Sequence, residues 1–408
     1  MAQKGFIFKK GGSWFLRYRD NVMEDGQVCR KQQCKRLAPV CDQYRTEKDL
    51  QGLRDEILMP INSGKVKPES TLTVAQFGEA YWLPWVRENC KPSTVAGYET
   101  TWRIYLAPNL QKITLRDFRT VDAAHLFVKI MQQHPKVGRT MIQHCKRRLS
   151  SLFGRALNEG ALDTRNPIEG AEIPRKATAP KKTRVATPEE VLVILDLLEK
   201  AGEWKARAAV GLIFFAGLRP GEARGTLWEN YDGKRLQVTQ SVWHTHTTTP
   251  KTAEAANPVP VIDTLAGILA KVRELDGNPT TGPMLRGERK GKPLNLDNLS
   301  KRVIMPAMRL CKACHQSELI HAKADHPFEL DPESPKWHGW YSLRRGVSTT
   351  LAGITGNALA SKGPLRHTNL STTTRNYVKD VPEITVSGMN KLDTLFNQCA
   401  TRPPETVN

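Results

Sequence analysis

The sequence predicts a mainly α-helical protein with small β elements. Over most of its 408 residues, apolar side chains recur at the spacing of a helix. Alternating apolar and basic residues occur at the N-terminus, and two short β-like runs occur after residue 234. A stretch rich in Pro, Thr and Lys separates two groups of predicted helices. Together these observations predict three folded parts.

Residues 1–66 are expected to form a small, basic, β-rich part. The text "GFIFKKGGSWFLRYRD" alternates around Gly11 and Gly12, which is typical of a hairpin with one wet, positive face. The text "QVCRKQQCKRLA" predicts a third strand. A helix is expected from Thr46 to Leu58, because Leu50, Leu53, Ile57 and Leu58 share one face.

Residues 67–175 are expected to form a helical domain, with helices at 92–106, 121–133 and 136–159. Residues 176–186 have the composition of a linker. The last part, 187–408, begins with predicted helices at 187–201 and 204–217. Two β-like runs, "RLQVTQSVWHT" and "NPVPVI", follow before helices resume.

The formal charge of +20 indicates a polyanion as partner. No segment approaches the roughly 18 apolar residues of a membrane span, and "MAQKGFIFKK" lacks the apolar core of a secretory signal. The eight cysteines are therefore expected to be reduced thiols in a cytoplasmic protein, without membrane contact.

Two arginines stand out. In "FFAGLRPGEARGTLW", Gly217 suits a helix end and Pro220 the first turn of the next helix, which places Arg219 on a tight bend. Glu222 follows three residues later, where it can orient the guanidinium. In "WYSLRRGVSTTLAG", Arg344 lies on a helix whose inward residues are Leu343, Val347 and Leu351.

Near the C-terminus, "RHTNLSTTTRNYV" places His367 and Tyr377 among hydroxyl and basic residues. A tyrosine of a hydrophobic core normally has apolar neighbours, whereas Tyr377 follows Thr374, Arg375 and Asn376. Packing alone is a poor explanation for it.

This ordered set resembles the catalytic pattern of the tyrosine recombinase (phage integrase) family. The family pattern is an arginine in TGLRxGE, a lysine in a β-hairpin, H-x-x-R, then LGH and a tyrosine. The counterparts in this sequence are Arg219, Lys251, Tyr341 (where the family has histidine), Arg344, His367 and Tyr377.

The resemblance implies a site-specific recombinase that cleaves and rejoins DNA through a 3′-phosphotyrosyl intermediate, to integrate or excise a mobile element. It assigns phosphate binding to Arg219 and Arg344, protonation of the departing 5′-oxygen to Lys251, a hydrogen bond to the phosphate to His367, and nucleophilic attack to Tyr377. Bidentate arginines suit the spread negative charge of such a reaction. No cofactor is required.

Two positions depart from the family pattern. Tyr341 replaces the usual histidine, and its phenol is a poor base at neutral pH. His338, one helical turn before Tyr341, is a candidate substitute. The second departure is Arg366, which replaces the usual glycine before His367.

The resemblance extends to the other parts. It implies that residues 1–66 are an arm-type DNA-binding module, that residues 67–175 are a core-binding (SAM-like) domain, and that residues 187–408 are an α+β catalytic domain with a C-terminal tail. The expected partners are double-stranded DNA at a specific site, a homotetramer on two duplexes, and an accessory DNA-bending or directionality factor in the nucleoid.

Several alternatives stay open. The chain could be a topoisomerase of type IB that relaxes DNA, or a catalytically silent DNA-binding protein of the same fold. The helix after Tyr377 could pack on its own domain or dock on a neighbouring protomer. Lys146, Arg147 and Arg148 could form a solvated face or contact phosphates.

A second cluster lies in "CKACHQSELIHAKADH". Cys311, Cys314, His321 and His326 are of the types and spacing that bind zinc, so a structural zinc ion is the cofactor candidate. The C-x-x-C-H text also matches covalent haem attachment, but that requires export. Reduced cysteines in a helix and loop are the remaining alternative.

Overall fold

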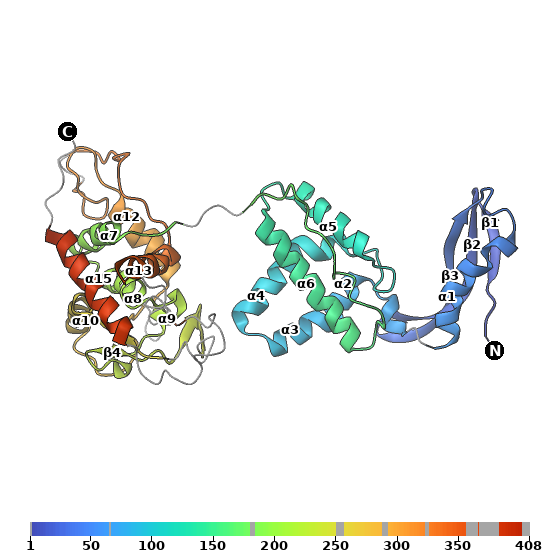
Figure 1. Ribbon diagram of the computed structural model, residues 1–408, viewed down its shortest axis with the longest axis horizontal. Coiled ribbons are helices and arrows are strands. Elements are labelled where there is room, and N and C mark those ends of the chain that lie inside the picture. The colour runs from blue at the N-terminus through green and yellow to red at the C-terminus, as the bar shows by residue number, and fades with distance from the viewer. Residues whose placement is uncertain are drawn as a thin grey trace. The chain divides into compact units, whose positions relative to one another are not determined.

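The computed structural model describes residues 2–64, 67–179, 184–249, 257–287, 293–322, 326–355, 366 and 383–401. The chain folds as two compact units, Met1–Lys181 and Lys182–Asn408 (Figure 1). The division between them falls inside the linker predicted at 176–186. The further division of the first unit at residue 66 stays a prediction.

Unit 1 begins with an antiparallel sheet of order β1-β2-β3, formed by β1 (Phe6–Lys10), β2 (Ser13–Glu24) and β3 (Gln27–Pro39). The predicted hairpin and third strand are confirmed. Gly11 and Gly12 adopt φ of 55° and 71°, values that glycine takes without strain. The sheet buries Trp14 and Leu16 against α1 (Gln51–Asn62).

The rest of unit 1 is helical. Its elements are α2 (Val74–Phe77), α3 (Leu83–Asn89), α4 (Pro92–Thr101), α5 (Thr120–Gln133) and α6 (Arg139–Asn158). The predicted helix at 92–106 ends in a π-helical turn from Trp102 to Leu106. The indole of Trp102 packs so closely on Gly78 that any side chain there would collide with it.

The sheet and the helices of unit 1 are joined by polar contacts. Arg116 donates from Nη1 to the buried Asp20 Oδ2 at 2.5 Å. The backbone N–H of Met23 donates to Thr71 Oγ1 at 3.0 Å. These contacts make one compact unit from the two parts that the sequence distinguishes.

Two of the three cations on α6 have structural contacts. Lys146 donates from Nζ to the carbonyl oxygen of Ala171 at 2.5 Å. The guanidinium of Arg148 lies 5.1 Å from the ring centroid of Tyr98. The prediction of a fully solvated face is therefore wrong for Lys146 and Arg148, because both side chains contact other parts of the protein. Arg147 is exposed.

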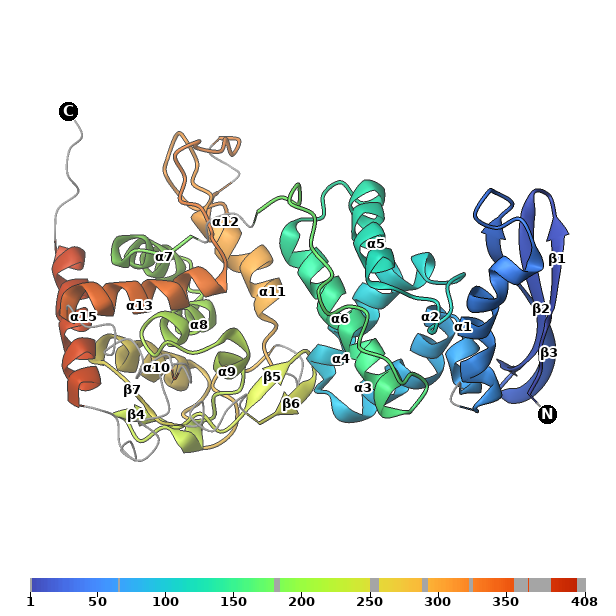
Figure 2. The ribbon, with the colours of Figure 1, turned by 45° about the vertical axis from the view of Figure 1, so that its right-hand side comes forward.

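Unit 2 is built around α8 (Trp204–Phe214), which is buried along most of its length. It packs against α7 (Pro188–Lys200), α10 (Asp263–Leu275) and α13 (Trp340–Thr355) (Figure 2). Unit 2 also contains three short helices, α9 (Pro220–Arg224), α11 (Leu296–Leu299) and α12 (Met305–Met308). The predicted helices at 187–201 and 204–217 are confirmed to within a turn.

The strands of unit 2 are short. Strand β4 (Arg235–Leu236) pairs with β7 (Val259–Pro260), and β5 (Ser241–Trp243) pairs with β6 (His246–Thr248). The fold class is therefore mainly α with small β elements, as predicted.

The C-terminal helix α15 (Glu383–Thr401) packs on its own unit, since Met389, Leu392 and Phe396 are buried in the same core as α8. The Phe396 ring meets Phe215 edge to face, with centroids 4.9 Å apart. Within this chain the helix packs on its own domain, which is one of the two alternatives; docking on a neighbouring protomer stays a prediction. Within the described ranges, none of the helices has the length and apolar character needed to cross a bilayer.

The close packing of α13 on α8 gives a test. A Cβ on Gly346 would collide with the carbonyl oxygen of Ala186 and lie 3.0 Å from Phe214 Cε2. We expect Gly346→Ala to destabilise unit 2 by about 1–3 kcal/mol through overpacking. Hydrogen exchange of α13 amides in the full chain measures the change.

Gly353→Ala, on the same helix, is the matched control, because a Cβ there meets no described atom within 4 Å. Alanine favours a helix over glycine by about 0.5–1 kcal/mol, so protection should stay equal or rise. Similar loss of protection in both variants would contradict the packing.

Candidate active site

The site is organised by Arg219, at the bend between α8 and α9. Gly217 takes φ of 61°, which ends α8, and Pro220 opens α9, as predicted. Arg219 donates its backbone N–H to Glu222 Oε2 at 2.8 Å and its Nη1 to Oε1 at 2.7 Å. The carboxylate thus fixes both the bend and the guanidinium, as the sequence predicts.

Glu222 is only 2% exposed, and its Oε2 also accepts a hydrogen bond from Arg366 Nη2 at 2.6 Å. Burial by itself raises the pKa of this carboxyl. The charge of Arg366 and the hydrogen bonds and charge of Arg219 outweigh it, so the pKa lies below its ordinary value. Glu222 is therefore ionised at neutral pH.

Arg344 approaches the same bend from α13. Its side chain is buried, and its Nη1 donates to the backbone carbonyl of Gly217. Burial, followed by the charge of Arg219, lowers the pKa of Arg344 to about 9. The protonated guanidinium is still the main form of Arg344 at neutral pH. A nearby anion would stabilise this charged form further.

Three guanidinium groups therefore surround one carboxylate. Glu222 faces Arg219 and Arg366 directly, and Arg344 lies within electrostatic range of all three. Among the described residues, the side chains of this cluster carry a net positive charge in a largely buried place, and such a charge is stabilised by an added anion. Arg219 is 26% exposed, so an anion of phosphate type can reach the cluster from solvent.

The hairpin of β5 and β6 is held against α9. A Cβ on Gly221 would lie 2.6 Å from Ser241 Oγ, and one on Gly225 would lie 2.7 Å from the carbonyl oxygen of Gln240. Arg224 donates to the carbonyl oxygens of Val242 and His244, at 3.2 and 2.8 Å. The β5–β6 hairpin thus lies beside the helix that Arg219 begins, while the predicted pairing of the two β-like runs around Lys251 is formed by β4 and β7.

Of the other residues predicted to belong to the site, the structure describes Tyr341 and His338. Tyr341 is 57% exposed and precedes Arg344 by one turn, close enough to influence its pKa. His338 does not lie one helical turn before Tyr341: Gly339 takes φ of 83° and α13 begins at Trp340. That prediction was wrong because the left-handed glycine starts the helix later. Lys251, His367 and Tyr377 lie outside the described residues.

Arg366 is the site residue that the sequence reasoning missed. It is 4% exposed, and its φ of 49° is left-handed, a conformation that glycine adopts more easily. The signal was present, because Arg366 stands where the resembling family has glycine. Its buried contact with a carboxylate 144 positions earlier could not be inferred from spacing.

The four zinc candidates are brought together. The ligand atoms of Cys311, Cys314, His321 and His326 all lie within 4.8 Å of one another. They belong to the segment between α12 and α13, and none of them contributes to the arginine cluster through a hydrogen bond or ion pair among the described contacts.

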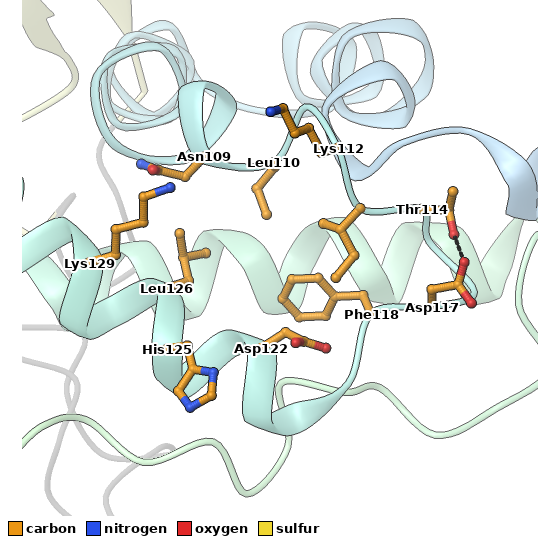
Figure 3. A pocket seen from close by; sticks show the side chains of 11 residues that line it. Asn109, Leu110, Lys112, Thr114, Asp117, Phe118, Asp122, His125, Leu126 and Lys129 are labelled. Carbon is orange, nitrogen blue, oxygen red and sulfur yellow. Dashed lines mark hydrogen bonds between the residues drawn. The ribbon is translucent and has the colours of Figure 1, made fainter. Parts of the chain in front are cut away.

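A pocket of about 470 Å³ lies elsewhere, in unit 1 beside α5 (Figure 3). It contains Lys112 and Lys129 but also Asp117 and Asp122, and Thr114 donates to Asp117 at 2.6 Å. Its charges balance, so it lacks the positive excess that distinguishes the arginine cluster as an anion site.

The buried carboxylate gives a test. Glu222→Gln keeps the shape of the side chain but removes the counter-ion of Arg366, and breaking such a buried pair costs about 3–5 kcal/mol. We expect unit 2 to lose stability in that range, measured by pulse proteolysis in urea with fragments assigned by mass.

Glu274→Gln, which removes the exposed partner of Lys271, is the control and should lower the free energy of unfolding by less than about 1 kcal/mol.

The pH dependence gives a second check. Because folding lowers the pKa of Glu222, this carboxylate stabilises the fold at pH values above the ordinary pKa of 4.5, and the stabilisation is lost as pH falls through the folded pKa. The difference between wild type and Glu222→Gln should shrink in acid; a constant difference would contradict an ionised Glu222.

Comparison with known proteins identifies one curated relative and several solved structures with a similar fold. No protein-family model matches the chain. A curated protein described as tyrosine recombinase XerC-like, from Caldanaerobacter subterraneus subsp. tengcongensis, is 23% identical over 423 aligned positions, which span 97% of this chain and 100% of the relative.

Two solved structures resemble the fold. The Tn1549 transposon integrase, in complex with a circular intermediate DNA, matches with a TM-score of 0.53 at 17% identity, over 79% of this chain and 99% of that one. A lambda integrase tetramer bound to a Holliday junction matches with a TM-score of 0.53 at 17% identity, over 92% and 98%. This chain is thus similar over nearly its whole length to a curated protein described as tyrosine recombinase XerC-like, and it has the fold of the two integrases.

Proposed function

We propose that the chain is a site-specific DNA recombinase that cuts and rejoins DNA through a covalent link to Tyr377. The observation that carries this proposal is the meeting of Arg219, Arg344 and Arg366 around the buried Glu222. These side chains come from the α8–α9 bend, from α13 and from the region just before His367. A DNA phosphate is the anion that the basic chain and its relatives suggest.

In this proposal, Arg219 and Arg344 bind the nonbridging oxygens of the scissile phosphate. Guanidinium groups match these oxygens in planar geometry and stay charged as negative charge develops during attack. Glu222 holds Arg219 in place without neutralising the cluster, because Arg366 binds its other oxygen. The donors are therefore oriented before DNA arrives, which is the condition for effective transition-state stabilisation.

The covalent step is assigned by resemblance. The phenolic oxygen of Tyr377 attacks the phosphorus and its proton passes to water, the bond from phosphorus to the 5′-oxygen breaks, and Lys251 protonates that oxygen. His367 donates a hydrogen bond to the phosphate. One phosphoester replaces another, so the reverse attack by a 5′-hydroxyl can reseal a strand without an external energy source.

We assign Tyr341 a hydrogen-bonding role. Its exposed side chain lies one turn from Arg344, where its hydroxyl can meet a phosphate oxygen. A phenol hydroxyl accepts a proton far less readily than a neutral imidazole, so Tyr341 does not replace the proton-accepting ability of histidine. The presence of Tyr341 where the family has histidine is also the observation that favours the alternative of a catalytically silent DNA-binding protein.

The N-terminal sheet supports binding of a second stretch of DNA. Strand β3 exposes Arg30, Lys31 and Arg36, and Arg17 lies over Phe8, 5.0 Å from the ring centroid. Such cations contact phosphates without reading sequence. We extend the proposal to a homotetramer on two duplexes, with residues 1–66 as the arm-type module.

Trapping the covalent intermediate tests the proposal. Nicked duplexes tiled across the DNA that flanks the gene should yield a protein–DNA adduct on denaturing gels. Tyr377→Phe should abolish the adduct and retain binding in a gel shift. Tyr341→Phe removes a hydroxyl from the same site and should still form adduct.

Each other outcome identifies an alternative. Tight binding without adduct in the wild type indicates a silent DNA-binding protein. Adduct and relaxation of supercoiled plasmid without exchange between two sites indicate a topoisomerase. Adduct formation by Tyr377→Phe would exclude Tyr377 as the nucleophile.

The arginine clamp gives a separate test. Arg219→Lys and Arg344→Lys keep a charge but lose the planar fork, and we expect adduct formation to slow by about 100-fold or more, the effect of losing one oriented donor. Arg345→Lys is the control, since Arg345 donates to the carbonyl oxygen of Arg184 at 2.9 Å outside the cluster. Single-turnover rates on the trapped duplex measure the effect; equal rates for all three variants would contradict the clamp.

A further inference from the structure

The segment between α12 and α13 has a feature that the recombinase chemistry does not use. Over residues 309–322 and 326–339, the structure contains isolated bridges, such as Leu310 with Ser317 and Cys311 with Leu330, but no helix or longer strand. Figure 2 shows it extending from α12 as loops. Something other than regular secondary structure must hold these loops.

Apolar burial does not supply the stability. Leu319, Ile320 and Leu330 are exposed, at 37%, 43% and 44%. Cys311 is fully buried, and His321 and His326 are partly buried. The segment thus turns Cys311, His321 and His326 inward and Leu319, Ile320 and Leu330 outward, which is the reverse of a hydrophobic core. Small segments without a core are commonly stabilised by a metal ion.

The inward side chains have the geometry of a metal site. Cys311 Sγ lies 3.2 Å from His326 Nε2, and His321 Nε2 lies 3.1 Å from the same nitrogen. Zinc bonds of about 2.3 Å to sulfur and 2.0–2.1 Å to nitrogen place tetrahedral ligand atoms roughly 3.3–3.8 Å apart. Small shifts would therefore give all four atoms one shared centre.

The backbone prepares Cys311 as a ligand. His315 adopts φ of 55°, and its backbone N–H donates to the carbonyl oxygen of Cys311 at 2.8 Å, which closes a tight turn over Cys311 and Cys314. This turn brings the sulfur atoms of Cys311 and Cys314 to within 4.8 Å of each other.

We propose that Cys311, Cys314, His321 and His326 bind one Zn²⁺ ion in a closed, structural site. Two thiolates and two imidazoles complete a tetrahedron and leave no position for substrate, which distinguishes structural from catalytic zinc. The spacing C-x₂-C followed by H-x₄-H lies in the range of structural zinc sites. His315, whose side chain is 72% exposed, is outside the ligand set, so the C-x-x-C-H text does not describe the site.

The ion would fix the chain that leads into α13. The backbone N–H of Leu310 donates to Ser334 Oγ at 3.0 Å, and that of Asp331 donates to the carbonyl of Leu310 at 2.9 Å. These bonds tie the turn that carries Cys311 and Cys314 to the approach to α13. Arg344 lies in the second turn of that helix, so the zinc ion supports the arginine cluster from a distance.

Metal content of the purified full chain tests the site independently of any DNA activity. Without chelators, we expect about one zinc per chain by elemental analysis, in line with a four-ligand structural site. Cys314→Ser and His326→Asn should each lose at least tenfold of this content. His315→Asn, next to Cys314 but outside the ligand set, should retain it.

Cobalt substitution separates binding from folding. Full chain stripped of zinc and given Co²⁺ should develop the visible bands of tetrahedral cobalt together with a thiolate charge-transfer band. His326→Asn should change the tetrahedral bands, and Cys314→Ser should weaken the charge-transfer band. A full chain that holds no zinc and gives no tetrahedral cobalt spectrum would overturn the site, as would variants that retain zinc at the wild-type ratio.

Discussion

The structure of unit 2 depends on one buried carboxylate. Glu222 accepts hydrogen bonds from the backbone and side chain of Arg219 and from Arg366. A carboxylate with so little exposure is stable only with paired charges. Its position three residues after Arg219 makes the same group a helix cap and a counter-ion, so the local fold of α9 and the electrostatics of the site cannot be separated.

The packing of α13 on α8 serves the same arrangement. Gly346 lets the helix approach Ala186 and Phe214, and the N–H of Ala186 donates to the carbonyl of Ser342 at 3.1 Å. This contact lies one turn from Arg344, whose guanidinium reaches the carbonyl of Gly217. A rigid helix–helix interface therefore sets the distance between two arginines that are far apart in sequence.

Local rules predicted the parts of the site that depend on neighbouring residues. The bend at Gly217, Pro220 at the start of α9 and the pairing of Arg219 with Glu222 all follow from turn and cap chemistry within six positions. The N-terminal hairpin followed from alternation around two glycines. The late start of α13 was missed because Gly339 adopts a left-handed conformation that the sequence alone does not specify. Arg366 was missed because its partner is distant, and a buried ion pair leaves no periodic pattern.

The chain passes between its two units once, and each unit has its own hydrophobic core. If both units bind DNA, as proposed, one unit can dissociate while the other stays bound. Because the two units belong to one chain, the dissociated unit then stays near the duplex at an effective concentration of about millimolar. Residence on DNA then reflects avidity more than the affinity of either unit. A tether of this kind favours slow departure from a site while permitting each half to exchange its contacts rapidly.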